Sequence, residues 1–528
     1  MANQDAFILC FLVTIGGLLP SVTHGTDPSH YTMPFNRTSF PSDFIFGAGS
    51  AAYQIEGAAN TDGRTPSIWD TFTKEDPEKI LDHSSGDVAE DFYHRYKEDI
   101  ALMKEIGLNS FRFSISWSRI LPYGRVSAGV NPEGVNFYNS LIDELLSNGI
   151  EPFITLFHWD FPQALQDEYG GFLSSRVVDD YRDYVEFCFE EFGDRVKYWV
   201  TINEPNYFSC FGYATGGTAP GRCSDYVGNC RLGNSATEPY IVVHNIILCH
   251  ATAVKIYREK YQASQKGTIG IIVTTFWKVP KFQTAESRKA ASRGLDFTIG
   301  WLLHPLTYGD YPKSMKSLVG NRLPKFSEEQ SKMIKGSIEF VGVNYYTARY
   351  VDSSTSSANL NLSYTTDSHV IQSTEKNGIP IGQKSGSSWL YIYPEGLRDL
   401  ILYIKRKYKN PPIFITENGI QDNSSMPIND ALNDSLRIQY HYLHLSYLLQ
   451  AIKEGAEVRG YYVWSFVDDF EWEFGYTVRF GLTYIDYKNG LKRIPKSSAF
   501  WFKSFLHGLN VTSASSSSSF FFSGMTSI

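Results

Sequence analysis

Short apolar runs alternate with longer amphipathic stretches along most of the chain. The short runs are rich in β-branched and aromatic residues, which is the pattern of buried strands. Eight of them are predicted to be strands: Phe44–Gly49, Ser110–Ser116, Pro152–Phe157, Val196–Ile202, Ile269–Thr275, Ile338–Asn344, Pro412–Thr416 and Arg459–Ser465.

Between these runs, apolar residues recur at intervals of three and four, the spacing of a helix with one buried face. In Val88–Ile106 this pattern stops at Gly107, a residue suited to the end of a helix. The same spacing predicts helices over Val135–Ser147, Val177–Phe192, Thr237–Tyr261, Pro394–Tyr408 and Ser435–Glu454. Strands that alternate with helices in this way predict an α/β fold, a single (β/α)8 TIM barrel with long loop insertions.

A doubly wound open sheet is the alternative architecture. It usually carries a G-x-G-x-x-G turn after an early strand. Here the first strand continues as FGAGSAAYQIEG, which does not match, and no acidic residue follows a second strand at the expected spacing. The pattern therefore favours the barrel.

Polar residues follow most of the predicted strands. In a (β/α)8 barrel these positions converge on one mouth, where active sites lie. The side chains expected there are Gln54, Arg112, His158, Trp159, Asn203, Glu204, Asn344, Tyr346, Glu417, Asn418 and Trp464. The fifth strand ends in Thr274, Thr275 and Trp277, to which the sequence assigns no role.

Two of these residues are glutamates in strand-like surroundings, Glu204 in YWVTINEP and Glu417 in IFITENG. Cleavage of a glycosidic bond needs such a pair: one carboxyl group protonates the leaving oxygen and one carboxylate faces the anomeric carbon. The structural alternative is that each glutamate pairs with an arginine and only stabilises the barrel. Because two glutamates each lie beside an asparagine, the catalytic interpretation is favoured.

The neighbouring residues fit this chemistry. Arg112 and Tyr346 are expected to keep Glu417 ionised, since a cation and a hydroxyl donor lower the pKa of a carboxyl group. The charge of Glu417 and partial burial are expected to raise the pKa of Glu204. Residues expected to bind sugar hydroxyls or to stack on a sugar ring are Gln54, His158, Asn203, Trp464, Glu471 and Trp472. For a single tryptophan, packing in the core is the usual alternative.

The composition and net charge of the chain exclude some classes of binding partner. The chain of 528 residues has a net charge of −8 and contains no basic block, which argues against nucleic acid or an anionic membrane as a partner. The sequence contains no HExxH motif and no zinc-like cysteine spacing, so no metal site is predicted.

The two ends of the chain differ from the rest. Residues 1–25 contain a short apolar run and resemble a signal peptide, although Asp5 replaces the usual basic residue; no later stretch is apolar enough to span a bilayer. Residues 26–510 are predicted to form the barrel domain, and residues 511–528 a serine-rich tail that is either disordered or a sorting signal.

Cysteines and glycosylation motifs agree with secretion. Cys223 and Cys230 bracket a short loop and are predicted to form a disulfide, whereas Cys188, Cys210 and Cys249 are predicted to be buried thiols. The N-x-[ST] motifs are at Asn36, Asn361, Asn423, Asn433 and Asn510.

The chain resembles the family 1 glycoside hydrolases, and within them the plant β-glucosidases, from about Phe40 to Leu506. The segments that carry the resemblance are FIFGAGSAAYQIEGA, FRFSISWSRILP, FITLFHWDFPQAL, YWVTINEPN, FVGVNYYTARY, IFITENGI and YVWSFVDDFEWEFGYTVRFGLTYID. The resemblance implies a (β/α)8 barrel that hydrolyses small-molecule β-glycosides with retention, without a metal or organic cofactor.

The resemblance also implies roles for individual residues. Glu204 matches the acid/base and Glu417 the nucleophile, and Tyr346 matches a tyrosine that contacts the nucleophile. Gln54, His158, Asn203, Glu471 and Trp472 match residues that bind the glucose hydroxyls, Trp464 stacks there, and Trp389 and Phe480 match walls of the aglycone site.

The sequence narrows the substrate specificity only in part. Glu204 favours O-glycosides, because related thioglucosidases have glutamine there, and Glu471 would repel a sugar phosphate. Asp469 departs from the asparagine of many relatives. The resemblance leaves open the aglycone, mono- or diglycoside substrates, a homodimer, and an extracellular, apoplastic or vacuolar location. A transglucosidase and a non-catalytic glycan-binding protein are the alternative functions.

Overall fold

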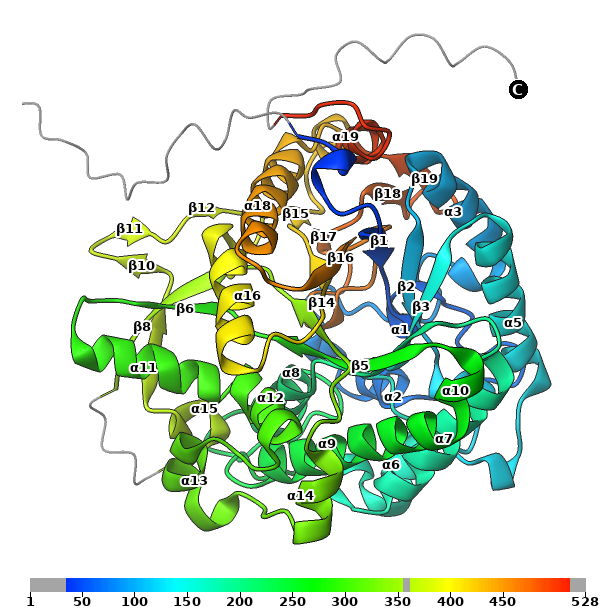
Figure 1. The fold of residues 1–528 in the computed structure, drawn as a ribbon. Helices are drawn as coiled ribbons and strands as arrows, with labels where there is room; N and C mark the ends of the chain where they lie inside the picture. Colours follow the sequence, from blue (N-terminus) through cyan, green and yellow to red (C-terminus); the bar gives the residue numbers. More distant parts are fainter. Residues whose placement is uncertain (1–34, 355–360, 513–528) are drawn as a thin grey trace, which may run out of the picture.

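The computed structural model describes residues 35–354 and 361–512. At its centre, eight parallel strands close into a barrel (Figure 1). The strands are β1 (Ile45–Gly49), β2 (Ser110–Ser114), β3 (Glu151–Phe157), β4 (Tyr198–Asn203), β5 (Thr268–Thr274), β7 (Phe340–Asn344), β14 (Ile413–Asn418) and β16 (Val458–Val463). Because β1 pairs with both β2 and β16, the sheet has no edge. Each strand overlaps a predicted one, so the barrel is confirmed and the open sheet is excluded.

Aromatic side chains fill the inside of the barrel. The rings of Phe153 on β3 and Phe414 on β14 have centroids 5.3 Å apart, although these strands are not neighbours. They belong to a cluster with Val200, Ile272, Phe340 and Tyr462. The barrel is therefore a packed core at this level, and the active site is expected at the mouth above it.

The predicted helices surround the barrel (Figure 1). They are α3 (Phe92–Ile106), α5 (Pro132–Ser147), α7 (Val177–Phe192), α9 (Glu238–Ile256), α16 (Glu395–Lys407) and α18 (Ser435–Lys453). The prediction for α3 was wrong at its start: Asp91 has a left-handed backbone (φ +57°), so the helix begins at Phe92 rather than Val88. Beyond α9 the chain continues as a π-helical turn, Tyr257–Tyr261.

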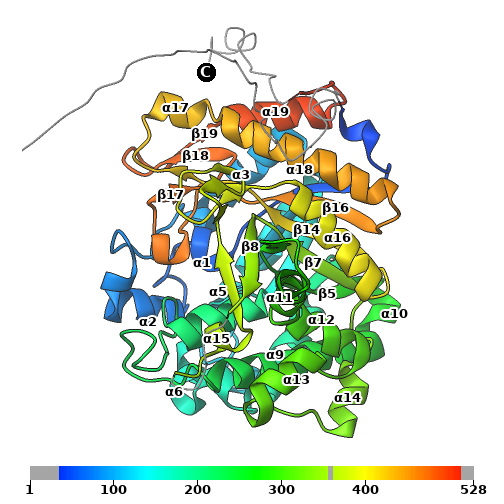
Figure 2. The ribbon, with the colours of Figure 1, turned by 90° about the vertical axis from the view of Figure 1, so that its left-hand side faces the viewer.

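Several elements were not predicted. Helices of seven residues or more outside the predicted set are α2 (Ile68–Glu75), α6 (Gln163–Tyr169), α11 (Ala285–Asp296), α12 (Ile299–Tyr308), α13 (Lys313–Val319), α14 (Glu328–Ile334) and α19 (Ser497–Leu506). A small sheet of β6 (Trp277–Pro280), β8 (Ala348–Ser353) and β9 (Val370–Ser373) packs with α11 outside the barrel (Figure 2). The strands of this sheet are four to six residues long, too short for a period-two pattern to stand out.

One helical stretch, Glu238–Gln265, is long and apolar enough to cross a membrane, contrary to the expectation that no such stretch follows the leader. Of its most apolar 18-residue window, 72% is buried inside the molecule. Its apolar character is thus explained by packing against α7 and the barrel.

The two ends of the described chain meet. Phe35 and Val511 form an antiparallel bridge, and the Asn36 amide donates to Asn510 Oδ1 over 2.8 Å. The first described residues lie beside α19 in Figure 1. The packed part of the chain therefore reaches Val511 and Thr512, the first two residues of the predicted tail; the predicted leader and residues 513–528 lie outside the described residues.

Cysteines follow the prediction with one exception. Cys223 and Cys230 form a disulfide, and Cys188 and Cys249 are buried thiols. Cys210 is only half-buried, since it lies in the irregular π-helical turn after α8 (Pro205–Ser209) rather than on a core-facing helix. Of the glycosylation motifs, Asn361, Asn423, Asn433 and Asn510 are exposed and Asn36 is half-buried.

Candidate active site

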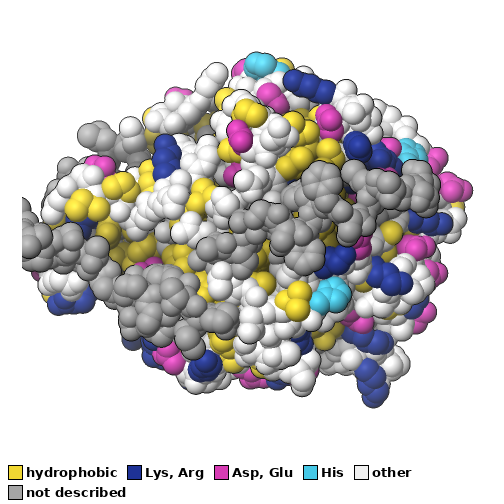
Figure 3. Space-filling model, turned by 90° about the horizontal axis from the view of Figure 1, so that it is seen from above, with side chains coloured by type: hydrophobic (Ala, Val, Ile, Leu, Met, Phe, Trp, Pro, Cys, Tyr) yellow, Lys and Arg dark blue, Asp and Glu magenta, His cyan; other side chains and the backbone are white. Residues whose placement is uncertain are grey.

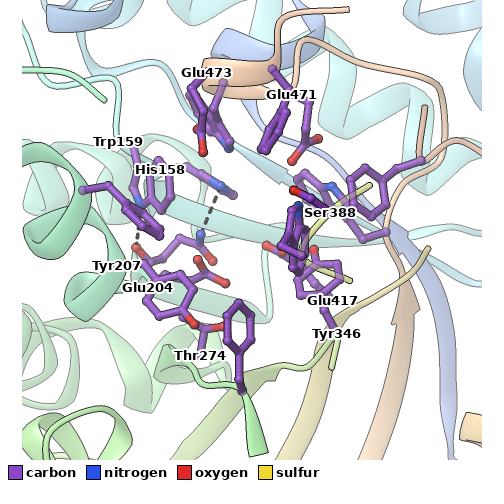
Figure 4. Close-up of a pocket in the computed structure, with 18 residues that line it drawn as sticks. His158, Trp159, Glu204, Tyr207, Thr274, Tyr346, Ser388, Glu417, Glu471 and Glu473 are labelled. Atoms are coloured by element: carbon purple, nitrogen blue, oxygen red, sulfur yellow. Dashed lines mark hydrogen bonds between the residues drawn. The ribbon is translucent and has the colours of Figure 1, made fainter. Parts of the chain in front are cut away.

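A cavity of about 340 Å³ opens at the carboxyl ends of the barrel strands (Figure 4). Its described wall consists of His158, Trp159, Asn203, Glu204, Tyr207, Phe211, Thr274, Phe276, Tyr346, Ser388, Trp389, Glu417, Trp464, Glu471, Trp472, Glu473, Phe474 and Phe480. Both predicted catalytic glutamates face this one cavity. The barrel thus brings together residues that are far apart in the sequence.

Glu204 sits at the junction between β4 and α8. Its backbone is left-handed, with φ +46°, and Pro205 begins the helix directly after it. Asn344, at the end of β7, donates its side-chain amide to Glu204 Oε1 over 2.7 Å. Left-handed backbone in a non-glycine residue costs about 1–3 kcal/mol and is concentrated at functional sites. Trp159 and Trp472 in the same wall share this backbone conformation.

Glu417 lies within β14, at a shift in its register with β7. The Arg112 guanidinium donates to Glu417 Oε1 over 2.6 Å, and the Tyr346 hydroxyl donates to Oε2 over 2.6 Å. Arg112 is fully buried and also donates to Asn203 Oδ1 over 2.8 Å. Both carboxylate oxygens of Glu417 are therefore fixed, with one oxygen held by a cation.

The two carboxyl groups have different environments. Burial, the larger cause, and the nearby charge of Glu417 together raise the pKa of Glu204 to about 8. Burial also raises the pKa of Glu417, while Arg112 and Tyr346 oppose this rise. The expectation that these two donors lower the pKa of Glu417 holds for their own effect, but burial outweighs it. Because Glu417 alone contacts a cation, the shared proton belongs on Glu204.

Hydrogen-bonding groups gather around Glu471. Gln54 is fully buried behind the wall; its Nε2 donates to Phe470 O over 2.9 Å and lies 3.5 Å from Glu471 Oε2, and its Oε1 has no partner in the described chain. Burial raises the pKa of the adjacent Asp469 to about 8, and burial together with the charge of Asp469 raises the pKa of Glu471 well above its usual value.

The floor of the cavity is held by a hydrogen-bond network. Asn203 Nδ2 donates to His158 Nε2 over 3.0 Å, and the indole of Trp159 donates to the Asn203 carbonyl over 3.0 Å. Burial holds the pKa of His158 well below its usual range, so this ring is neutral. Trp464 is nearly fully buried beside it, with ring centroids 6.0 Å apart.

Aromatic rings form the other side of the cavity. Phe276 stacks on Trp389 with centroids 5.7 Å apart, and the Arg349 guanidinium lies 4.4 Å from the Phe276 ring. Tyr346 meets Trp389 and Phe480 edge-on. The cavity thus combines a polar, carboxylate-rich part with a largely apolar aromatic part, which suits a sugar joined to an apolar group.

Of the predicted site residues, Gln54, Arg112, Asn344 and Asn418 lie behind the cavity wall and the other predicted ones line it. Trp159 and Thr274, expected at strand ends but without a role, also line the wall. Wall residues that sequence reasoning missed are Tyr207, Phe211, Phe276, Ser388, Glu473 and Phe474. Position just after a strand could have identified Phe276. Tyr207, Phe211 and Ser388 come from loops without a recognisable pattern.

Comparison with known proteins agrees with this geometry. The model of glycosyl hydrolase family 1 matches residues 36–510. The chain belongs to glycosyl hydrolase family 1. It is 60% identical to Beta-glucosidase 17 of Arabidopsis thaliana over 510 residues, covering 96% of this chain and 98% of that protein. It is 57% identical to furcatin hydrolase of Viburnum furcatum, covering 88% and 86% of the two chains.

Solved structures of β-glucosidases have the same fold as this chain. A rice β-glucosidase superimposes with a TM-score of 0.88 at 48% identity, covering 89% of this chain and 99% of that one. As a member of family 1, the chain is a retaining β-glucosidase that acts on small-molecule β-glycosides.

Proposed function

We propose that the protein hydrolyses β-glucosides of plant secondary metabolites by double displacement, with Glu204 as acid/base and Glu417 as nucleophile. The observation that carries this assignment is the asymmetry of the pair. Glu417 is held by Arg112 and Tyr346, whereas Glu204 accepts from the neutral amide of Asn344. A proton on Glu204 and a negative charge on Glu417 are the starting state that retaining hydrolysis needs.

In the first step, Glu204 donates its proton to the glycosidic oxygen while Glu417 forms a bond to the anomeric carbon. The aglycone leaves as an alcohol, and the glucosyl group stays esterified to Glu417. Formation of this ester removes the negative charge of Glu417, which is one of the causes that raise the pKa of Glu204. Glu204 then becomes a stronger acid, and its carboxylate is ready to take a proton from water.

In the second step, water attacks the anomeric carbon as Glu204 accepts the water's proton. The bond to Glu417 breaks, and glucose leaves with the β configuration because two inversions give net retention. A retaining site places the two carboxyl groups about 5–5.5 Å apart. Gln54, His158, Asn203, Glu471 and Trp472 bind the glucose hydroxyls, Trp464 stacks on the ring, and Trp389 and Phe480 border the aglycone.

The substrate class follows from the two parts of the cavity and from relatives whose names specify glycoside hydrolysis, furcatin hydrolase and raucaffricine-O-β-D-glucosidase. The aromatic part suits an apolar aglycone. The face in Figure 3 intersperses acidic and basic side chains rather than forming a basic stripe, which supports the proposal that neither nucleic acid nor membrane is a partner. We also propose residues 1–25 as a secretory leader, residues 26–510 as the enzyme domain, residues 511–528 as a tail, and an apoplastic or vacuolar location.

The acid/base assignment predicts a dependence on the leaving group. Glu204→Ala should lower kcat/KM for an alkyl β-glucoside by about 10²–10⁴-fold, because the alkoxide needs a proton. The same variant should lower kcat/KM for dinitrophenyl β-glucoside far less, since that phenolate leaves without help. The measurement is steady-state kinetics on both substrates, with Glu133→Ala on the outer helix α5 as the control. An equal decrease on both substrates would show that Glu204 is not the acid.

A further inference from the structure

The described wall of the active-site cavity carries four glutamates and no lysine or arginine. Three of them, Glu204, Glu417 and Glu471, already have places in the proposed reaction. The fourth, Glu473, lies in the short 3-10 helix η9 (Trp472–Phe474) and points into the cavity beside Glu471 (Figure 4). The proposed hydrolysis does not use the carboxylate of Glu473.

Glu473 has no charged partner of its own. Throughout the described ranges its carboxylate forms no salt bridge, and its backbone carbonyl accepts a hydrogen bond from the Leu81 amide over 2.8 Å. The side chain is half-buried, and burial raises its pKa to about 7. A carboxylate at the edge of an apolar cavity gains most from a cation brought by the ligand.

The rest of the cavity suits such a cation. The aromatic faces of Tyr207, Phe211 and Phe276 line the same cavity, and electron-rich ring faces attract ammonium groups. Two arginines behind the described wall already have partners: Arg112 is paired with Glu417, and Arg349 lies against Phe276. Neither can neutralise Glu473 as Arg112 neutralises Glu417.

We propose that Glu473 selects the aglycone by charge, so that the enzyme prefers β-glucosides whose aglycone bears a protonated amine and disfavours those whose aglycone bears a carboxylate. This inference rests on the proposed function of the site and adds a specificity-determining residue to it. Glu473 contacts the aglycone, not the reacting atoms, and therefore changes the choice of substrate rather than the chemical steps.

The test uses three phenyl β-glucosides that differ only in the substituent at position 3 of the ring: 3-(aminomethyl)phenyl, 3-(hydroxymethyl)phenyl and 3-(carboxymethyl)phenyl β-glucoside. For the full chain, kcat/KM should be about threefold to tenfold higher for the amine than for the neutral alcohol, the effect of one partly solvated charge pair. Glu473→Gln should lower this ratio by at least about threefold, and Glu473→Lys should reverse it in favour of the carboxylate. Glu133→Gln, on the exposed outer helix, should leave the ratio unchanged.

The pH dependence gives an independent readout. Because Glu473 is charged only above its pKa, the amine-to-alcohol ratio should rise as the pH rises through about 7, and this rise should disappear in Glu473→Gln. Glu204, Glu417, Glu471, Asp469 and His158 also face or adjoin the cavity, but all of them are kept in the variant, so their contribution stays in both curves.

Glu473→Gln with an unchanged amine-to-alcohol ratio would overturn the proposal. Equal decreases on all three glucosides would overturn it as well, because they would show a general structural role. If the unaltered chain failed to cleave even the neutral glucoside, the proposed function itself would be contradicted, an outcome distinct from either of these.

Discussion

The different roles of the two glutamates arise from their immediate partners. Sequence reasoning placed both residues at strand ends and correctly placed Arg112 and Tyr346 near Glu417. It overestimated the effect of these donors, because it had no measure of how completely Glu417 is buried. The carboxamide of Asn344, which bridges Asn203 and Glu204, was expected at the site but without a specific partner.

The coupling between the two carboxyl groups can be measured. Glu417→Gln removes one negative charge and should lower the pKa of Glu204 from its value of about 8. The pKa should stay above the usual value for a glutamate, because burial is the larger cause and is unchanged by the substitution. Carboxyl-selective infrared or NMR titration of the two proteins would measure the shift. An unchanged or increased pKa would show that the charges are not coupled as described.

The same coupling fixes the sign of the pH profile. Glu204 must be protonated for the first step, so kcat/KM falls as pH rises through the pKa of Glu204. Glu417 must be ionised, so kcat/KM also falls at low pH.

At the scale of elements, the barrel strands that position the proposed catalytic groups pack closely on their inner faces. Gly47 on β1 faces the Tyr462 ring on β16, and a Cβ at Gly47 would lie 2.4 Å from that ring and 2.7 Å from the Ser110 carbonyl. The role of Gly47 could not be predicted from the surrounding segment FGAGS. Its role depends on a ring from the far end of the chain, which local patterning cannot reveal.

Gly47→Ala should therefore destabilise the barrel. The added methyl group overpacks a filled interior and should lower the free energy of unfolding by about 1–3 kcal/mol. Gly217→Ala is the matched control, since the nearest atom to its Cβ would be 3.8 Å away. Thermal unfolding of both variants tests this expectation. Equal midpoints for the two variants would contradict the packing described for the barrel interior.

Strands and long helices could be predicted because each has a strong period of its own. The starts and ends were less predictable, as at Asp91, where the backbone turns left-handed just before the helix. The sheet of β6, β8 and β9 was missed because its strands are short and pair only with one another. The loops that carry Phe276, Trp389 and Glu473 are ordered by contacts across the cavity, such as the stack of Phe276 on Trp389, and no local pattern encodes these contacts.

At the scale of the whole molecule, one closed sheet connects residues from every part of the chain to a single cavity. The barrel could be predicted from the order of its elements, and the polar part of the cavity from residues at strand ends. The aromatic part could be predicted only at Trp389 and Phe480, through family resemblance. The proposed function follows the same division: it places the reacting groups at strand ends and the residues that choose the aglycone on loops.

The most direct test of the account is the stereochemistry of azide rescue. With azide and an activated aryl β-glucoside, Glu204→Ala should yield β-glucosyl azide, because azide attacks the glucosyl group on Glu417 from the side that water normally uses. Glu417→Ala should yield α-glucosyl azide, because azide then attacks the substrate directly in place of the missing carboxylate. NMR of the products distinguishes the two. These two anomers from the two variants would confirm both roles; the reverse pattern, or the same anomer from both variants, would contradict the assignment of Glu204 and Glu417.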